Sequence, residues 1–389
     1  MEGVMVRTGT YLEIDLDKIK DNSRILVEKC RPLGIEILGV TKGFSALPRI
    51  VEAMVTGGIS DLADSRLENI ISLRKKGFSQ SMTLLRIPRL SAVKKVVQLT
   101  DYSVNSEYSV IRELSDAAAA EDRKHKIVLM VDVGDLREGV LPDDAFEMAR
   151  SISKLDGVIL SGIGTNMGCY GGILPTMDNL NMLMDIAKKI KKKVGIELDI
   201  ISGGGTSSLR LIETGEMPEG INQLRIGEGI LLGTDTTHNE VIPWLHPDAF
   251  VLRAEVIEVK TKPSVPIGEV GLDAFGNTPC FEDKGLRKRA IVSLGRQDVN
   301  VDGLIPSDPN MYVLGASSDH LIVDVTDAAV DIAVGDQISF KLNYQGLLFL
   351  CNSKYVRKSY KRGKSCPSGS RPLYRQPRSV PPLRQLFLR

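Results

Sequence analysis

Cysteine and histidine are scarce in this sequence, and long apolar runs are missing from it. There are four histidines with no metal-ligand spacing and five cysteines with no CxxC spacing: Cys30, Cys169, Cys280, Cys351 and Cys366. An odd and scattered set of cysteines argues against a disulfide framework and against a structural zinc site. No apolar run approaches the roughly 18 to 20 residues of a membrane-spanning helix, and the start of the chain lacks the apolar stretch of a secretory signal. We therefore expect a cytoplasmic protein with no metal site and no membrane partner.

An excess of either charge is also missing. The 389 residues include 50 Lys and Arg against 49 Asp and Glu, so the net charge of +1 predicts no general attraction to nucleic acid. Residues 361–389 hold eight of the cations, five prolines and no acidic residue, which leaves residues 1–360 with a net charge of −7. This basic, proline-rich tail shows no periodicity and is predicted to be disordered.

Strand-like and helix-like segments alternate from about residue 35 to residue 226. Short β-branched or apolar runs are separated by longer stretches in which apolar residues recur every three or four positions. Eight runs are predicted to be strands: 35–41, 59–63, 82–86, 101–104, 126–133, 157–164, 196–202 and 221–226. Eight strands each followed by a helix are typical of the α/β fold known as the (β/α)8 TIM barrel, with a doubly wound open sheet as the alternative.

The pattern differs on both sides of this barrel. Residues 10–14 resemble a strand, and Asp15 then caps a predicted helix. After about Gly233 the helical period stops, and strand-like runs follow at 251–259, 289–294, 320–325 and 337–342. We predict an N-terminal strand within 1–14 that associates with a mostly β domain over 236–360, and a barrel over 15–235.

Unusual residues fall at the predicted carboxyl ends of the strands, where TIM barrels carry their chemistry. Lys42 follows the first strand in GVTKG, and burial there would lower its pKa toward a nucleophilic amine, although it could be an ordinary loop lysine. The seventh and eighth strands lead into SGGGTSS and RIGEG, and glycine loops of this kind bring backbone N–H groups close to a phosphate or simply make tight turns. The residues concerned are Ser202, Gly204, Gly205, Thr206, Arg225 and Gly227.

Two further polar residues follow the fifth and sixth strands. Arg137 could clamp a carboxylate or simply pair with Glu138, and Asn166 could contact a ring or simply make an Asx turn. A lysine, a phosphate cradle and a carboxylate clamp at one end of one barrel together suit a phosphorylated carbonyl cofactor and an amino-acid substrate. Pyridoxal 5′-phosphate (PLP) is such a cofactor.

These motifs make the chain resemble the fold-type III PLP enzymes of the alanine racemase family, over about residues 10–358. The likeness is to its ornithine and broad-specificity amino-acid racemase branch. The opening LEIDLDKIKDNSRIL is similar to the family's first strand and helix, and GVTKG to its pyridoxal-lysine motif, which implies that Lys42 binds the cofactor as an imine. The resemblance further implies that Arg137 lies near the substrate carboxylate and the cofactor's phenolic oxygen. It places Asn166 where a histidine stacks on the ring, and Arg225 opposite the pyridine nitrogen.

Arg225 bears on the expected reaction. A guanidinium cannot accept the proton that an acidic partner would stabilise on the pyridine nitrogen, so the ring should stay unprotonated. This favours proton exchange over transamination, and the acidic partner of the related decarboxylases is absent. Racemisation is therefore expected, with a decarboxylase or aldolase, or a non-catalytic PLP-binding protein, as the alternatives.

The chain departs from the family pattern at several positions. Arg296 replaces a tyrosine that family members supply across the dimer interface, so we expect Asp298 to be the proton carrier opposite Lys42. Met130 stands where some alanine racemases have a modified lysine beside the arginine. Tyr344 matches a family tyrosine near the phosphate or substrate, but could also be a strand tyrosine at a domain surface.

The branch that the chain resembles implies ornithine, lysine or several amino acids as substrates, more than alanine alone. A cationic side chain would need a carboxylate partner, for which Asp135, Asp273 and Asp298 are all open. The resemblance also implies a head-to-tail homodimer, in which the β domain of one subunit completes the barrel of the other.

Overall fold

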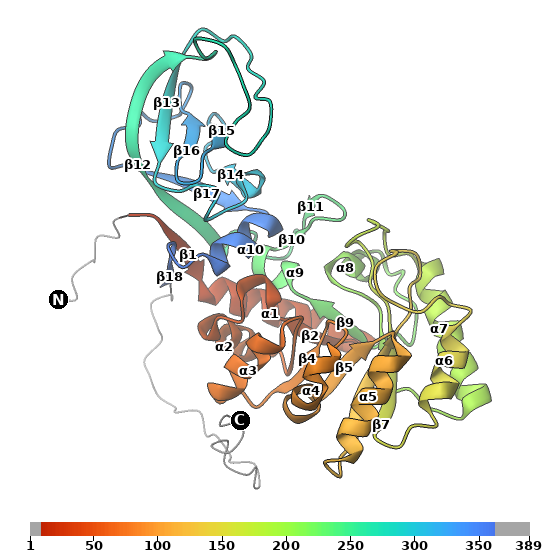
Figure 1. Ribbon diagram of the computed structural model, residues 1–389. Coiled ribbons are helices and arrows are strands. Elements are labelled where there is room, and N and C mark those ends of the chain that lie inside the picture. The colour runs from red at the N-terminus through yellow and green to blue at the C-terminus, as the bar shows by residue number, and fades with distance from the viewer. Residues whose placement is uncertain (1–8, 362–389) are drawn as a thin grey trace, which may run out of the picture.

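The protein is built around a closed barrel of eight parallel strands (Figure 1). The structure is a computed structural model and describes residues 9–361. The barrel strands are β2 (Glu36–Val40), β3 (Asp61–Asp64), β4 (Ser81–Leu84), β5 (Tyr102–Asn105), β6 (His125–Met130), β7 (Val158–Gly164), β8 (Ile200–Ser202) and β9 (Gln223–Ile226). Pairing of β9 with β2, with Arg225 opposite Leu38, closes the barrel. The predicted TIM barrel is thus confirmed, and the open-sheet alternative is wrong.

Helices surround the barrel: the first of them precedes the barrel strands in sequence, and the others follow those strands. They are α1 (Leu16–Cys30), α2 (Pro48–Thr56), α3 (Leu67–Lys75), α4 (Val93–Leu99), α5 (Tyr108–Ala119), α6 (Ala145–Ile152), α7 (Met177–Val194), α8 (Leu209–Thr214) and α9 (Glu228–Leu232). Local capping fixes several ends. Asp15 accepts hydrogen bonds from Asp17 N and Lys18 N at the start of α1, as predicted. Thr176 and Asn179 form a capping box on α7, which ends at Gly195 in the left-handed conformation. No helix in residues 9–361 has the length and apolarity needed to cross a membrane.

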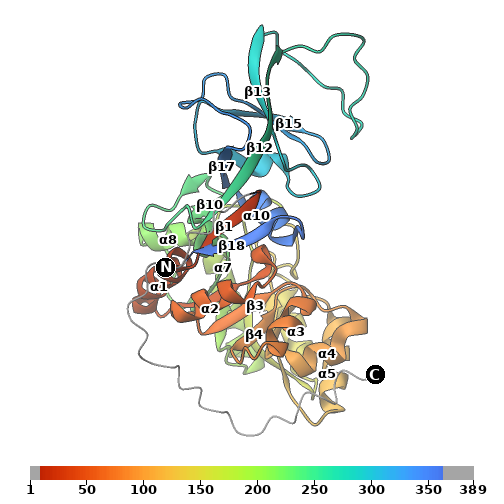
Figure 2. The same ribbon diagram turned by 90° about the vertical axis from the view of Figure 1, so that its left-hand side faces the viewer.

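The second domain is a mostly antiparallel sheet of eight strands that stands beside the barrel (Figures 1 and 2). Its strands are β1 (Tyr11–Asp15), β12 (Phe250–Pro263), β13 (Leu286–Val292), β14 (Leu304–Pro306), β15 (Tyr312–Ala316), β16 (Leu321–Asp324), β17 (Gln337–Leu342) and β18 (Arg357–Lys361). A small hairpin, β10 (Thr234–Asp235) and β11 (Glu240–Val241), follows the barrel. The long strand β12 then runs from the level of the barrel to the far end of the sheet, as Figure 2 shows.

The two ends of the described chain meet in this sheet. Strand β1 pairs antiparallel with β12 and parallel with β18, so Asp15 lies opposite Lys361. Lys361 also forms an ion pair of 2.6 Å with Glu13. The disordered tail was predicted to start at residue 361, but Lys361 is the last residue of β18. Residues 362–389 lie outside the described residues.

The sequence missed one helix of the second domain, α10 (Tyr344–Asn352). Asn343 caps it by accepting hydrogen bonds from Gln345 N and Gly346 N. Its apolar run LLFL has no helical periodicity, so the apolar pattern of the sequence did not indicate a helix here. Tyr344 is therefore the first residue of a helix, and the alternative of a strand tyrosine is wrong.

Candidate active site

A cavity of about 700 Å³ opens at the carboxyl ends of the barrel strands. Its wall contains side chains and loops that follow strands far apart in the sequence, including Ser65 after β3, Leu85 after β4 and Asn166 after β7. Eight of the predicted site residues line it: Lys42, Arg137, Asn166, Gly205, Thr206, Arg225, Gly227 and Tyr344.

Lys42 opens a 3₁₀ turn (Lys42–Phe44) directly after β2. The preceding residue, Thr41, is held in place by a hydrogen bond of 2.6 Å that its Oγ1 donates to the buried Asp64. Burial lowers the pKa of Lys42, and the Arg137 cation lowers it further, although Cys169, Glu138 and Asp64 oppose this. The amine of Lys42 is therefore easier to deprotonate than that of a free lysine.

Two glycine loops form an adjoining part of the wall. Residues 205–207 follow β8 and residues 227–228 follow β9, and Gly229 N donates to Thr206 Oγ1 at 3.2 Å between them. A Cβ on Gly205 would have one neighbour within 4 Å, Arg225 O at 3.4 Å. Gly204 has a φ of +106° and packs closely on Ser208, so this turn needs glycine.

Ser202 and Gly204 were expected to contact a phosphate, but they do not line the cavity. Ser202 is the last residue of β8 and is fully buried, and its hydroxyl accepts a hydrogen bond from Arg225. Its observed contact is therefore with the arginine.

Arg225 is 8% exposed and is held on both sides. Nη1 donates to Ser202 Oγ and Nη2 donates to the backbone oxygen of Thr165. Burial lowers the pKa of Arg225 to about 10, with a smaller contribution from the Arg137 cation. The guanidinium remains charged at neutral pH and offers only donors.

Arg137 lies in the loop after β6 and pairs with its neighbour. Nε donates to Glu138 Oε2 and Nη2 donates to Glu138 Oε1 at 2.5 Å. The Asn166 amide is best oriented with its oxygen toward the guanidinium. In this orientation the oxygen accepts hydrogen bonds from Arg137 Nη1 at 3.2 Å and Nη2 at 3.1 Å. The pairing with Glu138 that the sequence left open is thus present, but inside the cavity wall.

Tyr344 brings the second domain into the site. Its ring lies against Gly43, the residue after Lys42, because α10 packs on the 3₁₀ turn that contains Gly43. Burial raises the pKa of the Tyr344 phenol, with a further contribution from the Glu228 carboxylate, so the phenol stays protonated at neutral pH.

Asp298 does not line this cavity. It is 9% exposed and accepts a hydrogen bond of 2.7 Å from Ser353 Oγ. Arg296 is exposed, donates from Nε to Ala316 O, and stacks its guanidinium over the Phe275 ring.

Two of the carboxylates considered for a cationic substrate are used within the chain. Asp135 is 2% exposed and accepts hydrogen bonds from Cys169 N, Tyr170 N and Gly171 N at 3.2 to 3.3 Å. Asp273 is in the exposed β12–β13 connection and accepts from the backbone of its own turn. Neither lines the cavity.

Five titratable residues that line the cavity were not among the predicted site residues: Arg86, Glu138, Cys169, Glu228 and Asp235. Glu138 and Glu228 directly follow Arg137 and Gly227, so their places beside predicted site residues were the available signal. Glu228 Oε1 accepts from Thr234 Oγ1, Thr236 N and Thr236 Oγ1. Burial raises the pKa of Glu228.

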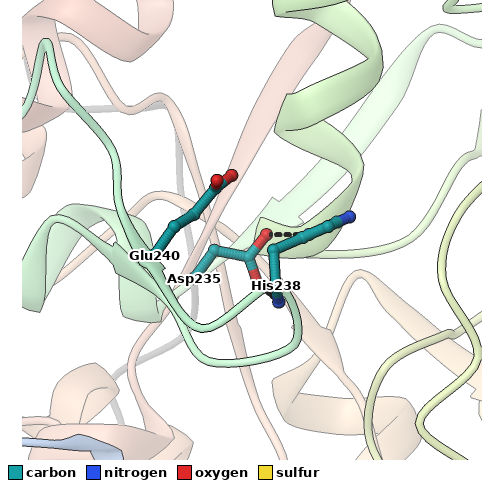
Figure 3. A group of neighbouring side chains, drawn as sticks. All are labelled: Asp235, His238 and Glu240. Carbon is teal, nitrogen blue, oxygen red and sulfur yellow. Dashed lines mark hydrogen bonds and ion pairs between the residues drawn. The ribbon is translucent and has the colours of Figure 1, made fainter.

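The β10–β11 hairpin gathers three groups of the kinds that bind metals (Figure 3). Asp235, His238 and Glu240 place one ligand atom each within 4.8 Å of one another. Asp235 Oδ2 is already bonded to His238 Nδ1 at 2.7 Å, and Glu240 pairs with Arg210 at 2.8 Å. These contacts stabilise the hairpin that forms one edge of the cavity.

The comparisons with known proteins agree with this geometry. The sequence model described as "Alanine racemase, N-terminal domain" matches residues 14–235. The chain is 46% identical to "Lysine racemase" of Thermotoga maritima, over 90% of this chain and 98% of that protein. It is 43% identical to "Ornithine racemase" of Acetoanaerobium sticklandii, over 89% of this chain and 98% of that protein.

A solved structure shares the fold. The alanine racemase from D-cycloserine-producing Streptomyces lavendulae superposes with a TM-score of 0.71 at 19% identity, covering 92% of this chain and 98% of that chain. The predicted resemblance is confirmed: the chain belongs to the alanine racemase family.

Proposed function

We propose that this racemase uses PLP to interconvert the L and D forms of an amino acid with a cationic side chain, lysine or ornithine. The observation that carries the proposal is one cavity in which the amine of Lys42, the guanidinium of Arg137 and two glycine loops converge. The relatives at 46% and 43% identity, named for lysine and ornithine, support the choice of substrate.

The groups around the cavity suit PLP. Lys42 offers an amine whose pKa burial lowers, as an imine-forming lysine requires. At Gly205 a side chain would project into space that a phosphate could fill, and the neighbouring loop at Gly227 adds backbone N–H groups. When bound, PLP would act as an electron sink that acidifies the α proton of the attached amino acid.

Arg225 would limit that electron sink. It is buried and cationic and has no acceptor atom, so it cannot hold a proton on the ring nitrogen as a carboxylate would. This supports proton exchange over chemistry that needs a long-lived carbanion.

Lys42 would remove or return the α proton on one face of the substrate. For the opposite face we propose Asp298 of the partner subunit in a head-to-tail homodimer, because the chain's own Asp298 lies outside its own cavity. The Asp298→Asn variant tests this directly, and retention of full racemisation would overturn the assignment.

The test of the function is incubation of the protein and PLP in deuterium oxide with L-ornithine, L-lysine or L-alanine. Optical rotation and the NMR signal of the α proton are followed together. We expect loss of rotation and α-deuteration, faster for lysine or ornithine than for alanine. A visible imine band without exchange would instead indicate a binding protein, and release of carbon dioxide would indicate a decarboxylase.

A further inference from the structure

Arg137 lines the cavity, but the Nε and Nη2 edge of its guanidinium is already hydrogen-bonded to Glu138. The Glu138 carboxylate accepts hydrogen bonds from both Nε and Nη2, which is the bidentate arrangement of a guanidinium and a carboxylate. A substrate carboxylate therefore cannot occupy this edge while Glu138 stays in place.

The remaining edge of the guanidinium is fixed by Asn166, whose amide oxygen accepts from Nη1 and Nη2. Arg137 has five N–H donors in a rigid plane, so two partners on two edges set the orientation of that plane. The second N–H of Nη1 is left as the donor that can point to a ligand. The side chains of Arg137 and Glu138 are 35% and 20% exposed, so solvent screens this pair less than a surface pair.

The charges of the pair also act on Lys42. The titratable groups that act on the pKa of its amine are Arg137, Glu138, Cys169 and Asp64, and the first two have opposite effects on it. Loss of the Glu138 charge would leave the Arg137 cation uncompensated beside Lys42, which disfavours the protonated amine.

We propose that Glu138 is a positioning residue that fixes the Arg137 guanidinium and keeps the Arg137–Glu138 pair neutral beside Lys42. The proposal rests on the proposed function, since it assigns Arg137 a role toward the substrate or cofactor. The competing assignment makes Glu138 the partner of the substrate's distal ammonium group. The two differ in which kinetic constant changes and for which substrates.

The test compares Glu138→Gln, which removes the charge, with Glu138→Asp, which keeps it on a shorter side chain. In Glu138→Gln we expect kcat to fall about 10- to 100-fold for lysine, ornithine and alanine alike, because a misplaced guanidinium affects every substrate. Glu138→Asp should recover part of the loss. Glu147→Gln, which breaks an exposed ion pair with Arg150 on α6, is the matched control and should be unchanged.

A second readout needs neither cofactor nor activity. Acetic anhydride labelling of Lys42 in the cofactor-free protein, followed by mass spectrometry, gives the pH of half-maximal reaction. We expect this pH to move downward in Glu138→Gln and to stay in place in Glu147→Gln. A lower labelling pH supports the proposal even in a protein that fails to racemise any of the three amino acids.

Two results would overturn the positioning role. One is an unchanged labelling pH together with an unchanged kcat in Glu138→Gln. The other is a KM that rises for lysine and ornithine only, which would make Glu138 the partner of the substrate ammonium. Thermal melting of each variant separates these outcomes from a folding defect.

Discussion

The ring of Tyr344 lies against Gly43, so closely that a Cβ on Gly43 would be 3.3 Å from Tyr344 Cε2. Gly43 follows Lys42 in the barrel, whereas Tyr344 begins α10 of the second domain. The two domains therefore meet beside the reactive amine, and each limits the position of the other.

Gly43→Ala should disturb the site through this contact. The added methyl group would also lie 3.3 Å from Leu231 Cδ1, and overpacking of this kind costs about 1–3 kcal/mol. We expect weaker PLP binding and slower racemisation, measured by absorbance titration and by polarimetry. Gly271→Ala is the control, because a Cβ there has nothing within 4 Å. Equal behaviour of the two variants would contradict the contact.

Lys42→Ala should remove both the visible absorbance of bound cofactor and the activity. Loss of a group that transfers the α proton costs about 10²–10⁴-fold, and loss of covalent attachment adds to this. Absorbance spectra and α-proton exchange check the result, with the exposed Lys154→Ala as control. Full racemisation by Lys42→Ala would exclude Lys42 as the catalytic base.

His125 should make the stability of the fold depend on pH. Burial lowers its pKa to about 4, with Arg123 adding to the shift and Asp101 opposing it, and its Nε2 is bonded to Ser103 Oγ. Between about pH 6.5 and pH 4 the unfolded chain takes up a proton that the folded protein does not, so the free energy of unfolding falls as pH falls. The loss is roughly 3 kcal/mol across this window.

Urea denaturation over that pH range measures the effect. His125→Gln should lose most of this pH dependence, whereas His320→Gln, at an exposed position, should keep it. A His125→Gln protein with the slope of the parent would show that other groups cause it.

Asp135→Asn should loosen the loop after β7. The buried carboxylate holds three backbone N–H groups of residues 169–171, and a neutral amide cannot replace all of these contacts. We expect a loss of about 1–3 kcal/mol in the free energy of unfolding and faster proteolysis near residue 170. Asp116→Asn, on the exposed side of α5, is the control. Unchanged proteolysis would show that the three contacts do not hold the loop.

The cysteines should differ in their reaction with iodoacetamide. Burial raises the pKa of Cys30 to about 11 and that of Cys351 to about 12, so both should stay unlabelled, whereas Cys169 and Cys280 are exposed. PLP should protect Cys169, which lines the cavity, and leave Cys280 as an internal control. Peptide mass mapping reads out each site. Equal labelling of Cys169 with and without cofactor would place PLP elsewhere.

Much of the barrel could be predicted from local sequence. Each predicted strand overlaps one of β2 to β9. Buried strands are short apolar runs and the helices between them have apolar residues with a period of 3.6, so both elements can be recognised from local sequence. The ends were less certain: the strand predicted over 196–202 is β8 at Ile200–Ser202. Lys42 and Arg225 could be singled out because they lie near the carboxyl ends of strands.

The contacts among the site residues could not be predicted in this way. Sequence identified Lys42, Arg137, Arg225 and the glycine loops as unusual residues at strand ends, since a charge or a glycine beside an apolar run is a local signal. Only the tertiary structure decided that Glu138 fills one edge of Arg137, that Ser202 serves Arg225 and that α10 brings Tyr344 to Gly43. Side-chain direction and the packing of residues about 300 positions apart depend on how the whole chain closes, which no local pattern records.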